Sequence, residues 1–502
     1  NLVRGTHQMS FGGTMTYSMV NAQSKNSTVP NFSFNGQETG LGMADYFLGK
    51  PDTYLQGAPS NAYELDLFPA LYAQDAWKAK PNLTVNLGLR WEPYLPWSMR
   101  QGWVFNFDAN RFHQGIHSTV LPKAPAGLYY PGDPGFPGKS AMHNHWQQFG
   151  PRIGLAWDVK GDGRTSVRAS YGISYEHIPL FWFSDILTAG PWYNRTNILS
   201  PPGGLADPWQ GFPGGNYLPL QSVNPQSAFW IPYGDYMNRP YDNVTPYTEA
   251  WNLTIQKQVA SDWLLSTSYI GSSTIHTWDM KTLNPAAYIP GGPCTMNGVT
   301  YNPCSSTSNI NQRRLFTLER PQDGQNLGRV SDFDDGGTMS YHAMRLSAER
   351  RAAKGASISG NYTWSHCIGL VGGTVDQGLS IGSGYPNLSN RDSDRGNCLS
   401  SRRHIVNVTA LAESPQFANK TMRMLATGWR LSGIYRWSTG SYLTVTDGTD
   451  RALNGVGSQR PNQILADVFK DKSAGPLTQY VNLAAFSLPP LGTENGNLGR
   501  AN

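Results

Sequence analysis

The chain has 502 residues, of which only 15% are charged, and its 39 basic and 34 acidic residues give a formal net charge of +5. The hydrophobic fraction is 39% and the mean hydropathy is −0.44, with no stretch near the roughly 18–20 apolar residues of a transmembrane helix and no basic run typical of nucleic-acid binding. Aromatic residues make up 12% of the chain, which argues against intrinsic disorder and leaves a folded protein rich in Gly and Pro loops.

Alternating apolar and polar residues predict β-strands along much of the chain. In residues 165–176, Val167 and Tyr175 belong to an apolar set, whereas Arg168 and Glu176 lie on the opposite side. In chain order the predicted strands lie near residues 7–19, 65–78, 83–92, 153–159, 165–176, 251–255, 265–269, 344–348, 358–364, 406–410, 429–437 and 442–446. The pattern therefore predicts roughly 12 strands.

The connections between these strands alternate between short turns and long loops. The long connections run approximately over residues 21–62, 93–150, 178–246, 274–338 and 368–402. Strict alternation brings all long connections to one end of a sheet, as in outer-membrane barrels with tight periplasmic turns and long extracellular loops. We therefore predict an all-β fold, part of an antiparallel transmembrane β-barrel in contact with the lipid of a Gram-negative outer membrane.

Six tryptophans lie near the ends of predicted strands. In a membrane barrel they would form an aromatic girdle at the lipid–water interfaces, whereas in a soluble β protein they would be ordinary core residues. The girdle is favoured because no helical sequence is available to cover the apolar faces. These residues are Trp77, Trp91, Trp251, Trp263, Trp364 and Trp437.

The four cysteines form two local pairs in predicted loops. Cys294 lies near Cys304, and Cys367 lies near Cys398. An even number at close spacing favours disulfides in an oxidising compartment, and local pairing is the simplest of three connectivities. The alternative, a zinc site, calls for a CxxC spacing or nearby histidines, which the sequence lacks.

Several sequence blocks carry a more specific signal. They include ADYFLG at 44–49, YAQDAWK at 72–78 and PNLTVNLGLRWE at 81–92. Further blocks lie at residues 35–37, 151–158, 171–176, 251–253, 268–272, 361–365, 428–434 and 496–500. Together and in this order they resemble the Oar-like TonB-dependent transporters of acidobacterial type.

This resemblance implies a function and a domain organisation. Full-length members carry a signal sequence, a periplasmic carboxypeptidase-regulatory-like domain, a plug and a barrel of around 22 strands. Residues 1–502 would be a fragment of the barrel, without a plug domain or a TonB-contacting segment. The expected function is ligand capture by extracellular loops and energised uptake through a plugged lumen. The implied partners are the TonB system, through the plug region, and an extracellular siderophore, glycan, peptide or protein.

Charged residues on the polar faces of predicted strands are candidates for the lumen. They would tune a solute path, or they would pair with one another or with the plug and only solvate the wall. These candidates are Arg90, Glu92, Arg168, Glu176, Arg430 and Arg436.

Aromatic residues in the long loops are candidates for ligand contact, because rings stack on sugars and anchor peptides. The alternative is that they pack against each other and cover the mouth of the barrel. They are Trp182, Trp192, Tyr193, Trp209, Phe212, Trp230 and Tyr233.

Metal sites and catalysis have weaker support. The acidic segments SDFDDGG, at 331–337, and RDSDRG, at 391–396, lack the terminal bidentate carboxylate of an EF-hand loop, so solvated loops are favoured over Ca²⁺ sites. His143 and His145 form a lone HxH pair. No supported catalytic order of residues appears, and we expect neither an enzyme nor a cofactor. The alternatives are a surface adhesin or structural barrel and an outer-membrane enzyme.

Overall fold

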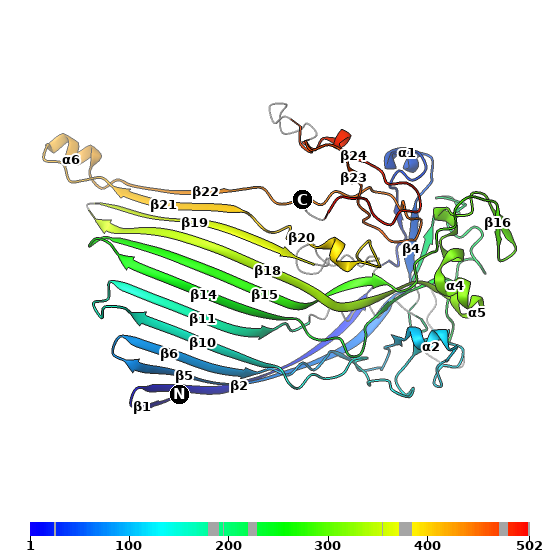
Figure 1. The fold of residues 1–502 in the computed structure, drawn as a ribbon, viewed down its shortest axis with the longest axis horizontal. Coiled ribbons are helices and arrows are strands. Elements are labelled where there is room, and N and C mark those ends of the chain that lie inside the picture. Colours follow the sequence, from blue (N-terminus) through cyan, green and yellow to red (C-terminus); the bar gives the residue numbers. More distant parts are fainter. Residues whose placement is uncertain are drawn as a thin grey trace.

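The computed structural model describes residues 1–24, 27–178, 190–193, 195–218, 228–353, 355–370, 384–470 and 480–499. Long antiparallel strands lie side by side in one curved sheet (Figure 1). Short turns join them at one end, and the long connections gather at the other, which we call the cap. No helix in these residues is long and apolar enough to cross a membrane.

Eleven long strands form the described wall, each antiparallel to the next. They are β2 (His7–Ser24), β5 (Ser60–Lys80), β6 (Leu83–Trp91), β10 (Phe149–Asp158), β11 (Thr165–Tyr175), β14 (Tyr247–Gln258), β15 (Trp263–Thr282), β18 (Leu327–Ala353), β19 (Ala356–Gly369), β21 (His404–Glu413) and β22 (Arg430–Ser438). The short β1 (Leu2–Arg4) adds to the edge beside β2. Within the described chain β22 pairs only with β21, so the barrel is not closed.

Eleven of the twelve predicted strands are present, and the twelfth prediction is wrong. Residues 442–446 form no strand. The chain leaves the sheet after Ser438 and folds into the cap, where the Asp447 backbone N–H donates to the Gln459 carbonyl oxygen at 3.0 Å. Alternation over five residues is too short to distinguish a strand from an extended cap segment.

The register keeps one face of the wall apolar across eight strands. One row of opposed residues is Trp77, Val85, Leu155, Ala169, Leu253, Tyr269, Met344 and Trp364. Leu253 is 44% exposed and Trp364 is 51% exposed, so this face is not covered by protein. An exposed apolar surface of this extent marks contact with a membrane or a partner.

The neighbouring row belongs to the opposite, polar face. Its opposed residues are Thr84, Ala156, Arg168, Thr254, Ser268, Arg345 and Thr363. A one-residue slip would exchange the two faces, so the paired register explains why the alternation predicted from single strands holds across the wall.

The long connections fold into the cap with small elements of their own. These are α1 (Gly42–Phe47), β4 (Thr53–Gly57), β12 (Arg195–Leu199), β13 (Gly234–Asn238), α2 (Ala109–His113), α4 (Leu315–Glu319) and α5 (Pro321–Gly324). β4 pairs with β12, and β13 pairs in parallel with the start of β18. Phe105, Tyr130, Trp230 and Leu327 belong to the largest buried cluster of the cap. The cap is therefore a packed layer attached to the wall.

The turn between β21 and β22 contains a helix that the sequence did not predict. The short connection after β21 holds α6 (Lys420–Ala426), at the short-turn end of the sheet (Figure 1). Asn419 caps the helix by accepting from the backbone N–H groups of Thr421 and Met422.

Candidate functional site

The six candidate lumen residues all lie on the polar face or continue its alternation. Arg90 Nε donates to Glu92 Oε2 at 2.5 Å, and Arg430 pairs with Glu413 across the β21–β22 ladder. Arg168 lies opposite Thr254, and Arg436 opposite Asn407. Two of the predicted charges therefore pair with each other, and whether all six line a lumen remains a prediction.

A groove of about 640 Å³ runs along this polar face. It is lined by polar side chains from neighbouring strands, among them Gln8, Gln74, Asn86, Arg152 and Ser170. Glycines at positions 88, 154 and 172 also line it and leave room between these side chains. Apolar residues such as Ile153 and the carboxylate of Asp75 also border the groove. Its width, amides, hydroxyls and single guanidinium suit a hydrated path rather than a tight binding site.

Most of the candidate loop aromatics are buried inside the cap. Trp209 Nε1 donates to Tyr54 Oη at 3.1 Å, and Trp230 Nε1 donates to Tyr130 Oη at 3.0 Å. Trp209 is 8% exposed and Trp230 is 4% exposed. These partners leave the indoles no free donor for a ligand, so the geometry favours the packing interpretation.

The other candidate aromatics follow the same trend. Tyr193 is buried and hydrogen-bonded to Asn61, and Trp192 packs against buried residues of the cap. Phe212 is buried, and Tyr233 packs against its cluster. Trp182 lies outside the described residues.

Both expected disulfides are present. Cys294–Cys304 joins the ends of a small hairpin formed by β16 (Cys294–Met296) and β17 (Val299–Tyr301), and Cys367–Cys398 ties β19 to the segment that follows β20 (Gly396–Asn397). Cys294–Cys304 closes a loop within one long connection of the cap, whereas Cys367–Cys398 ties the connection after β19 to a strand of the wall. In the described residues no cysteine is free.

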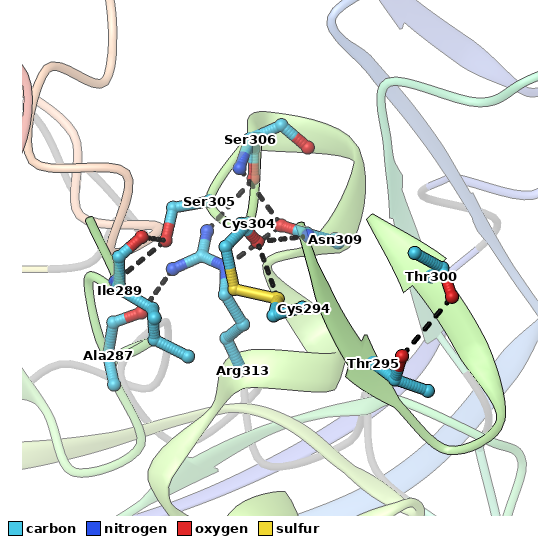
Figure 2. Close-up of a disulfide and its surroundings, with 10 residues drawn as sticks. All are labelled: Ala287, Ile289, Cys294, Thr295, Thr300, Cys304, Ser305, Ser306, Asn309 and Arg313. Atoms are coloured by element: carbon cyan, nitrogen blue, oxygen red, sulfur yellow. Dashed lines mark hydrogen bonds between the residues drawn. A yellow bond between two sulfur atoms is a disulfide. The ribbon is translucent and has the colours of Figure 1, made fainter. Parts of the chain in front are cut away.

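A fully buried arginine lies beside the first disulfide (Figure 2). The Arg313 guanidinium donates to Asn309 Oδ1 at 2.8 Å and to the carbonyl oxygens of Ser306 and Leu453, both at 2.9 Å. It also donates to the Ala287 carbonyl oxygen. Burial lowers the pKa of this guanidinium to about 10. Arg313 therefore fastens a segment 140 residues further along the chain to the disulfide-bonded hairpin.

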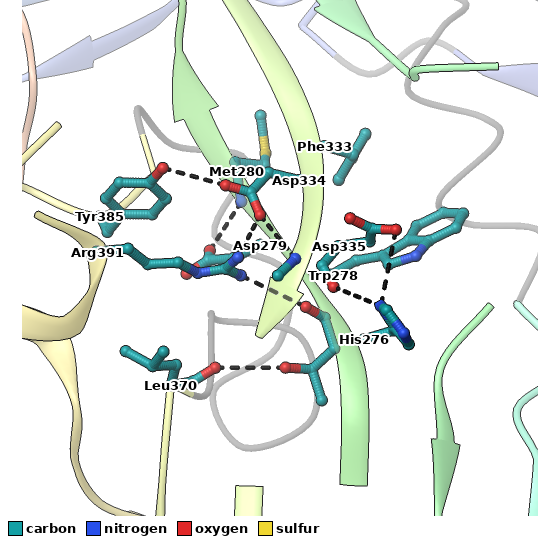
Figure 3. Close-up of polar contacts among 12 residues, drawn as sticks. His276, Trp278, Asp279, Met280, Phe333, Asp334, Asp335, Leu370, Tyr385 and Arg391 are labelled. Carbon is teal, nitrogen blue, oxygen red and sulfur yellow. Dashed lines mark hydrogen bonds and ion pairs between the residues drawn. The ribbon is translucent and has the colours of Figure 1, made fainter. Parts of the chain in front are cut away.

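The acidic segment at 331–337 is not a solvated loop, and this expectation is wrong. It belongs to β18, where Asp334 pairs with Arg391 and accepts from Tyr385 Oη at 3.1 Å (Figure 3). Asp332 accepts from Asn238 Nδ2 at 2.9 Å, and burial raises the pKa of Asp332 to about 7. The carboxylates are engaged by cap residues distant in sequence, which local spacing does not reveal.

The other residues considered as metal ligands are not grouped around a common site either. Asp335 accepts from the Val244 backbone N–H at 2.7 Å, and Asp394 pairs with Arg460 at 2.7 Å. His145 contacts Tyr94 ring to ring, while His143 contacts Tyr241. Among the residues with described positions, no three His, Cys, Asp or Glu side chains are grouped to hold a metal ion.

An ion-paired centre that the sequence did not indicate lies beneath the cap surface. Asp235 is 2% exposed and accepts from Arg195 Nη2 at 2.8 Å and from Arg329 Nη2 at 2.6 Å. The two guanidinium groups hold the pKa of Asp235 well below its usual range despite burial. The three residues come from β12, β13 and β18, and no short-range spacing connects them.

A second buried acid continues the polar face into the cap. Glu64 on β5 is 2% exposed, and neither carboxylate oxygen has a hydrogen-bond partner. Burial raises the pKa of Glu64 to about 7, although the positive charge of Arg239 opposes the shift. Asp66, two residues along the same strand, lies 3.2 Å from His177 Nε2.

The comparisons with known proteins place this geometry in a family. A family model described as an outer membrane beta barrel domain matches residues 1–502. The chain belongs to this outer membrane β-barrel family. No curated protein sequence matches it. The Oar-like type and the missing plug, which the sequence blocks implied, stay predictions.

The comparison with solved structures found matches at low identity, three of which are given below. The transporter YddB from Escherichia coli is 11% identical, with a TM-score of 0.38 over 87% of this chain and 45% of that chain. A mutant ferric enterobactin receptor, PfeA, from Pseudomonas aeruginosa is 11% identical, with a TM-score of 0.42 over 88% and 40%. The FrpB iron transporter from Neisseria meningitidis is 8% identical, with a TM-score of 0.39 over 88% and 42%. This outer membrane β-barrel spans less than half the length of each.

Family membership indicates what each face of the sheet contacts and on which side of the membrane each end lies. In an outer membrane β-barrel the apolar face contacts lipid, the short turns are periplasmic and the long loops are extracellular. The predictions of the fold class and of the outer-membrane location are confirmed. Residues 60–70 of β5 extend past its pairing with β6, and residues 276–282 of β15 extend past its pairing with β14, so both segments reach into the extracellular cap while they stay beside β2 and β18.

Proposed function

We propose that this chain is the barrel portion of a TonB-dependent outer-membrane transporter. The cap captures a ligand from outside the cell, and the polar face conducts it once a plug has been displaced through the TonB system. The chain itself contributes the wall, the polar path and the cap, and it needs no cofactor for this role.

One observation carries the proposal: the side of the sheet that carries the groove also carries polar residues of the cap. The groove at Gln74 and Arg152 lies on the same side of β5 and its neighbours as Glu64 and Asp66. Between them β5 carries Ala70 and Phe68, but the residues paired with these on β2 are Thr14 and Thr16. A solute that enters through the cap would therefore meet hydrogen-bonding groups in the cap, along β2 and in the groove. The ordered sequence blocks, including YAQDAWK and PNLTVNLGLRWE, support the TonB-dependent class.

The packed cap also supports capture rather than simple diffusion. An open pore would need loops that leave its mouth clear, whereas here buried aromatic clusters and two disulfides fix the long connections. A rigid extracellular layer reduces the entropy lost when a ligand binds.

The test uses the full-length protein in its outer membrane, with and without a functional TonB protein. Mass spectrometry of the spent medium identifies compounds that cells remove only when the barrel protein is produced. We expect this removal to stop when TonB is lost. Binding without removal would identify an adhesin, and conversion of a medium compound outside the cell would identify an enzyme; either result would overturn the proposal.

A further inference from the structure

The helix α6, at the periplasmic end of the sheet, exposes apolar side chains. Met422, Met424 and Leu425 are all exposed, and Met424 is exposed over 77% of its surface. No residue of the helix is buried, and the helix projects past the ends of β21 and β22 (Figure 1). By contrast, the turn between β10 and β11 is Lys-Gly-Asp-Gly-Arg, at 160–164. Three exposed apolar side chains on so short a helix indicate contact with something outside the described chain.

The wall beside α6 is the lipid-facing side of β22. Trp437 belongs to a row of the apolar face with Val406, Tyr362 and Leu346. Side chains two residues apart on a strand share a face, so Leu431 lies on that face as well. The pairing with β21 continues one residue beyond β22, because the Ser414 backbone N–H donates to the Trp429 carbonyl oxygen at 2.9 Å. Trp429, two residues before Leu431, therefore also lies on the lipid-facing side.

The Trp429 side chain holds the end of α6 on this side. Its Nε1 donates to the Leu425 carbonyl oxygen at 2.7 Å, which is one of the last helix carbonyls and has no partner within the helix. Trp77 and Trp157 lie on the same face, near the periplasmic ends of their strands. Tryptophans at such positions mark the lipid–water interface of a barrel. The helix is therefore held at the depth of the interface and away from the polar face.

The residues of α6 divide into an apolar side and a basic side. At 3.6 residues per turn, Met422 and Leu425 share one side of the helix. Lys420 and Arg423, also three residues apart, share the opposite side. Arg423 Nε donates to the Phe417 carbonyl oxygen at 2.9 Å. This bond engages only part of the guanidinium group, which has further N–H donors for a phosphate.

The connection that contains α6 carries positive charge only. Residues 414–429 include Lys420 and Arg423 and no Asp or Glu. The preceding carboxylate, Glu413, is already paired with Arg430. Basic groups beside a membrane attract anionic phospholipids, and an apolar side opposite them lets a helix lie in the interface. An acidic protein would match the charge, but the position of α6 on the lipid-facing side favours lipid.

We propose that α6 is an interfacial anchor that binds anionic phospholipid in the periplasmic leaflet of the outer membrane. Met422 and Leu425 contact the acyl chains next to the head groups, and Lys420 and Arg423 contact the phosphate groups. The anchor extends the lipid-facing surface of the wall through Trp429 and adds two positive charges to it. It requires the outer-membrane location and does not depend on transport.

The depth of α6 is measured on the full-length protein in vesicles of equal parts phosphatidylcholine and phosphatidylglycerol. Leu425→Cys carries a bimane label, and a spin label on the lipid acyl chains, close to the head group, quenches bimane on contact. The matched control is Lys160→Cys with the same label, in the polar turn at the same end. We expect about threefold stronger quenching in Leu425→Cys, as for a residue within the interface. Equal quenching at the two positions would overturn the proposal.

Heat-modifiable migration verifies that each labelled variant is folded. Met422→Cys, on the same side of α6, should be quenched as strongly as Leu425→Cys and takes its place if that variant misfolds. Native protein treated with the same bimane reagent gives the background, because all four cysteines of this chain are in disulfides.

The head-group preference is measured on labelled Leu425→Cys, with spin-labelled phosphatidylglycerol and spin-labelled phosphatidylcholine compared as quenchers. We expect phosphatidylglycerol to quench about twofold more strongly, and we expect added Lys420→Gln or high salt to reduce this ratio. Added Lys50→Gln makes the same change of charge on an exposed residue of the extracellular cap and should leave the ratio unchanged. Equal quenching by the two lipids without these changes would overturn the assignment to anionic phospholipid.

A periplasmic protein is the alternative occupant of this surface. In that case a water-soluble thiol reagent would modify Leu425→Cys in the vesicles but not in intact outer membranes. A lipid anchor protects the cysteine in both, whereas Lys160→Cys is modified in the vesicles. Ready modification of Leu425→Cys in the vesicles would therefore overturn the proposal.

Discussion

Arg329 makes a bidentate contact with Asp235, with Nε donating to Oδ1 at 2.9 Å and Nη2 donating to Oδ2 at 2.6 Å. The two residues lie on β18 and β13, which run parallel, and Arg195 on β12 completes the centre. Because the charges are buried, removal of one partner leaves the others without compensation. This centre therefore fixes the cap to a strand of the membrane wall.

Asp235→Asn should lower the free energy of unfolding by about 3–5 kcal/mol, because two buried guanidinium groups lose their counter-ion. Urea unfolding followed by tryptophan emission measures the change. Glu413→Gln is the matched control, because the Arg430–Glu413 pair is exposed on the wall, and such pairs contribute about 0–1 kcal/mol. Equal effects of the two substitutions would contradict the role assigned to the buried centre.

Stability should fall as the pH rises from about 4.5 toward 7, because the folded-state pKa of Glu64 is about 7 against an ordinary 4.5. Over this range the folded state holds a proton that the unfolded state has lost, so the slope of unfolding free energy against pH is negative. The expected loss is about 2–3 kcal/mol. In Glu64→Gln the slope should be shallower, with the remainder due to other carboxylates whose pKa burial raises, Asp332 and Asp447 among them. An unchanged slope in this variant would refute the assignment.

Arg313→Lys should loosen the segment that follows β22. A compact ammonium group cannot reach Asn309 and the Leu453 carbonyl at once, and buried acceptors left without a donor cost about 1–3 kcal/mol each. We expect faster cleavage within residues 446–470 in limited proteolysis, located by mass spectrometry. Arg345→Lys, on the exposed polar face of the wall, should leave the cleavage pattern unchanged. If Arg313→Lys also left it unchanged, the segment would have another anchor.

Gly271→Ala should disturb the apolar face, because a Cβ at this position would lie 2.4 Å from the Trp251 ring on the paired strand. The ring must rotate away, at a cost of about 1–3 kcal/mol for overpacking. We expect a lower temperature for the heat-modifiable transition and a shifted tryptophan emission. Gly433→Ala is the control, because no atom lies within 4 Å of its Cβ position. An undisturbed Gly271→Ala barrel would show that this contact does not hold the ring.

The wall was predictable from the sequence because its signal is local. Val167, Tyr175, Arg168 and Glu176 alternate within one strand, and pairing with β10 and β14 only extends that pattern. Short periplasmic turns are encoded in the same way, by a few adjacent residues. The exception is α6, whose start depends on the single N-cap residue Asn419.

The cap was not predictable because its contacts join residues far apart in sequence. Arg329 and Asp235 are 94 residues apart, and Arg391 and Asp334 are 57 residues apart. For aromatic loop residues such as Trp230 the sequence left ligand contact and mutual packing open, because composition does not show whether a ring faces solvent or a neighbouring ring. Asn197 and Thr449, about 250 residues apart, line one cavity of the cap that only the folded chain forms.

The length of β18 has a mechanical consequence. Its 27 residues extend roughly 90 Å, about three times the thickness of a bilayer's hydrocarbon core, so one strand passes from the cap into the wall. The ladder with β15 follows it past the irregularities near Thr277 into the cap. The part of the cap formed by the ends of β15 and β18 cannot move away from the wall without breaking the hydrogen bonds between these two strands. In the proposed transporter, ligands would therefore have to pass between the loops of the cap, because the ends of β15 and β18 stay in place.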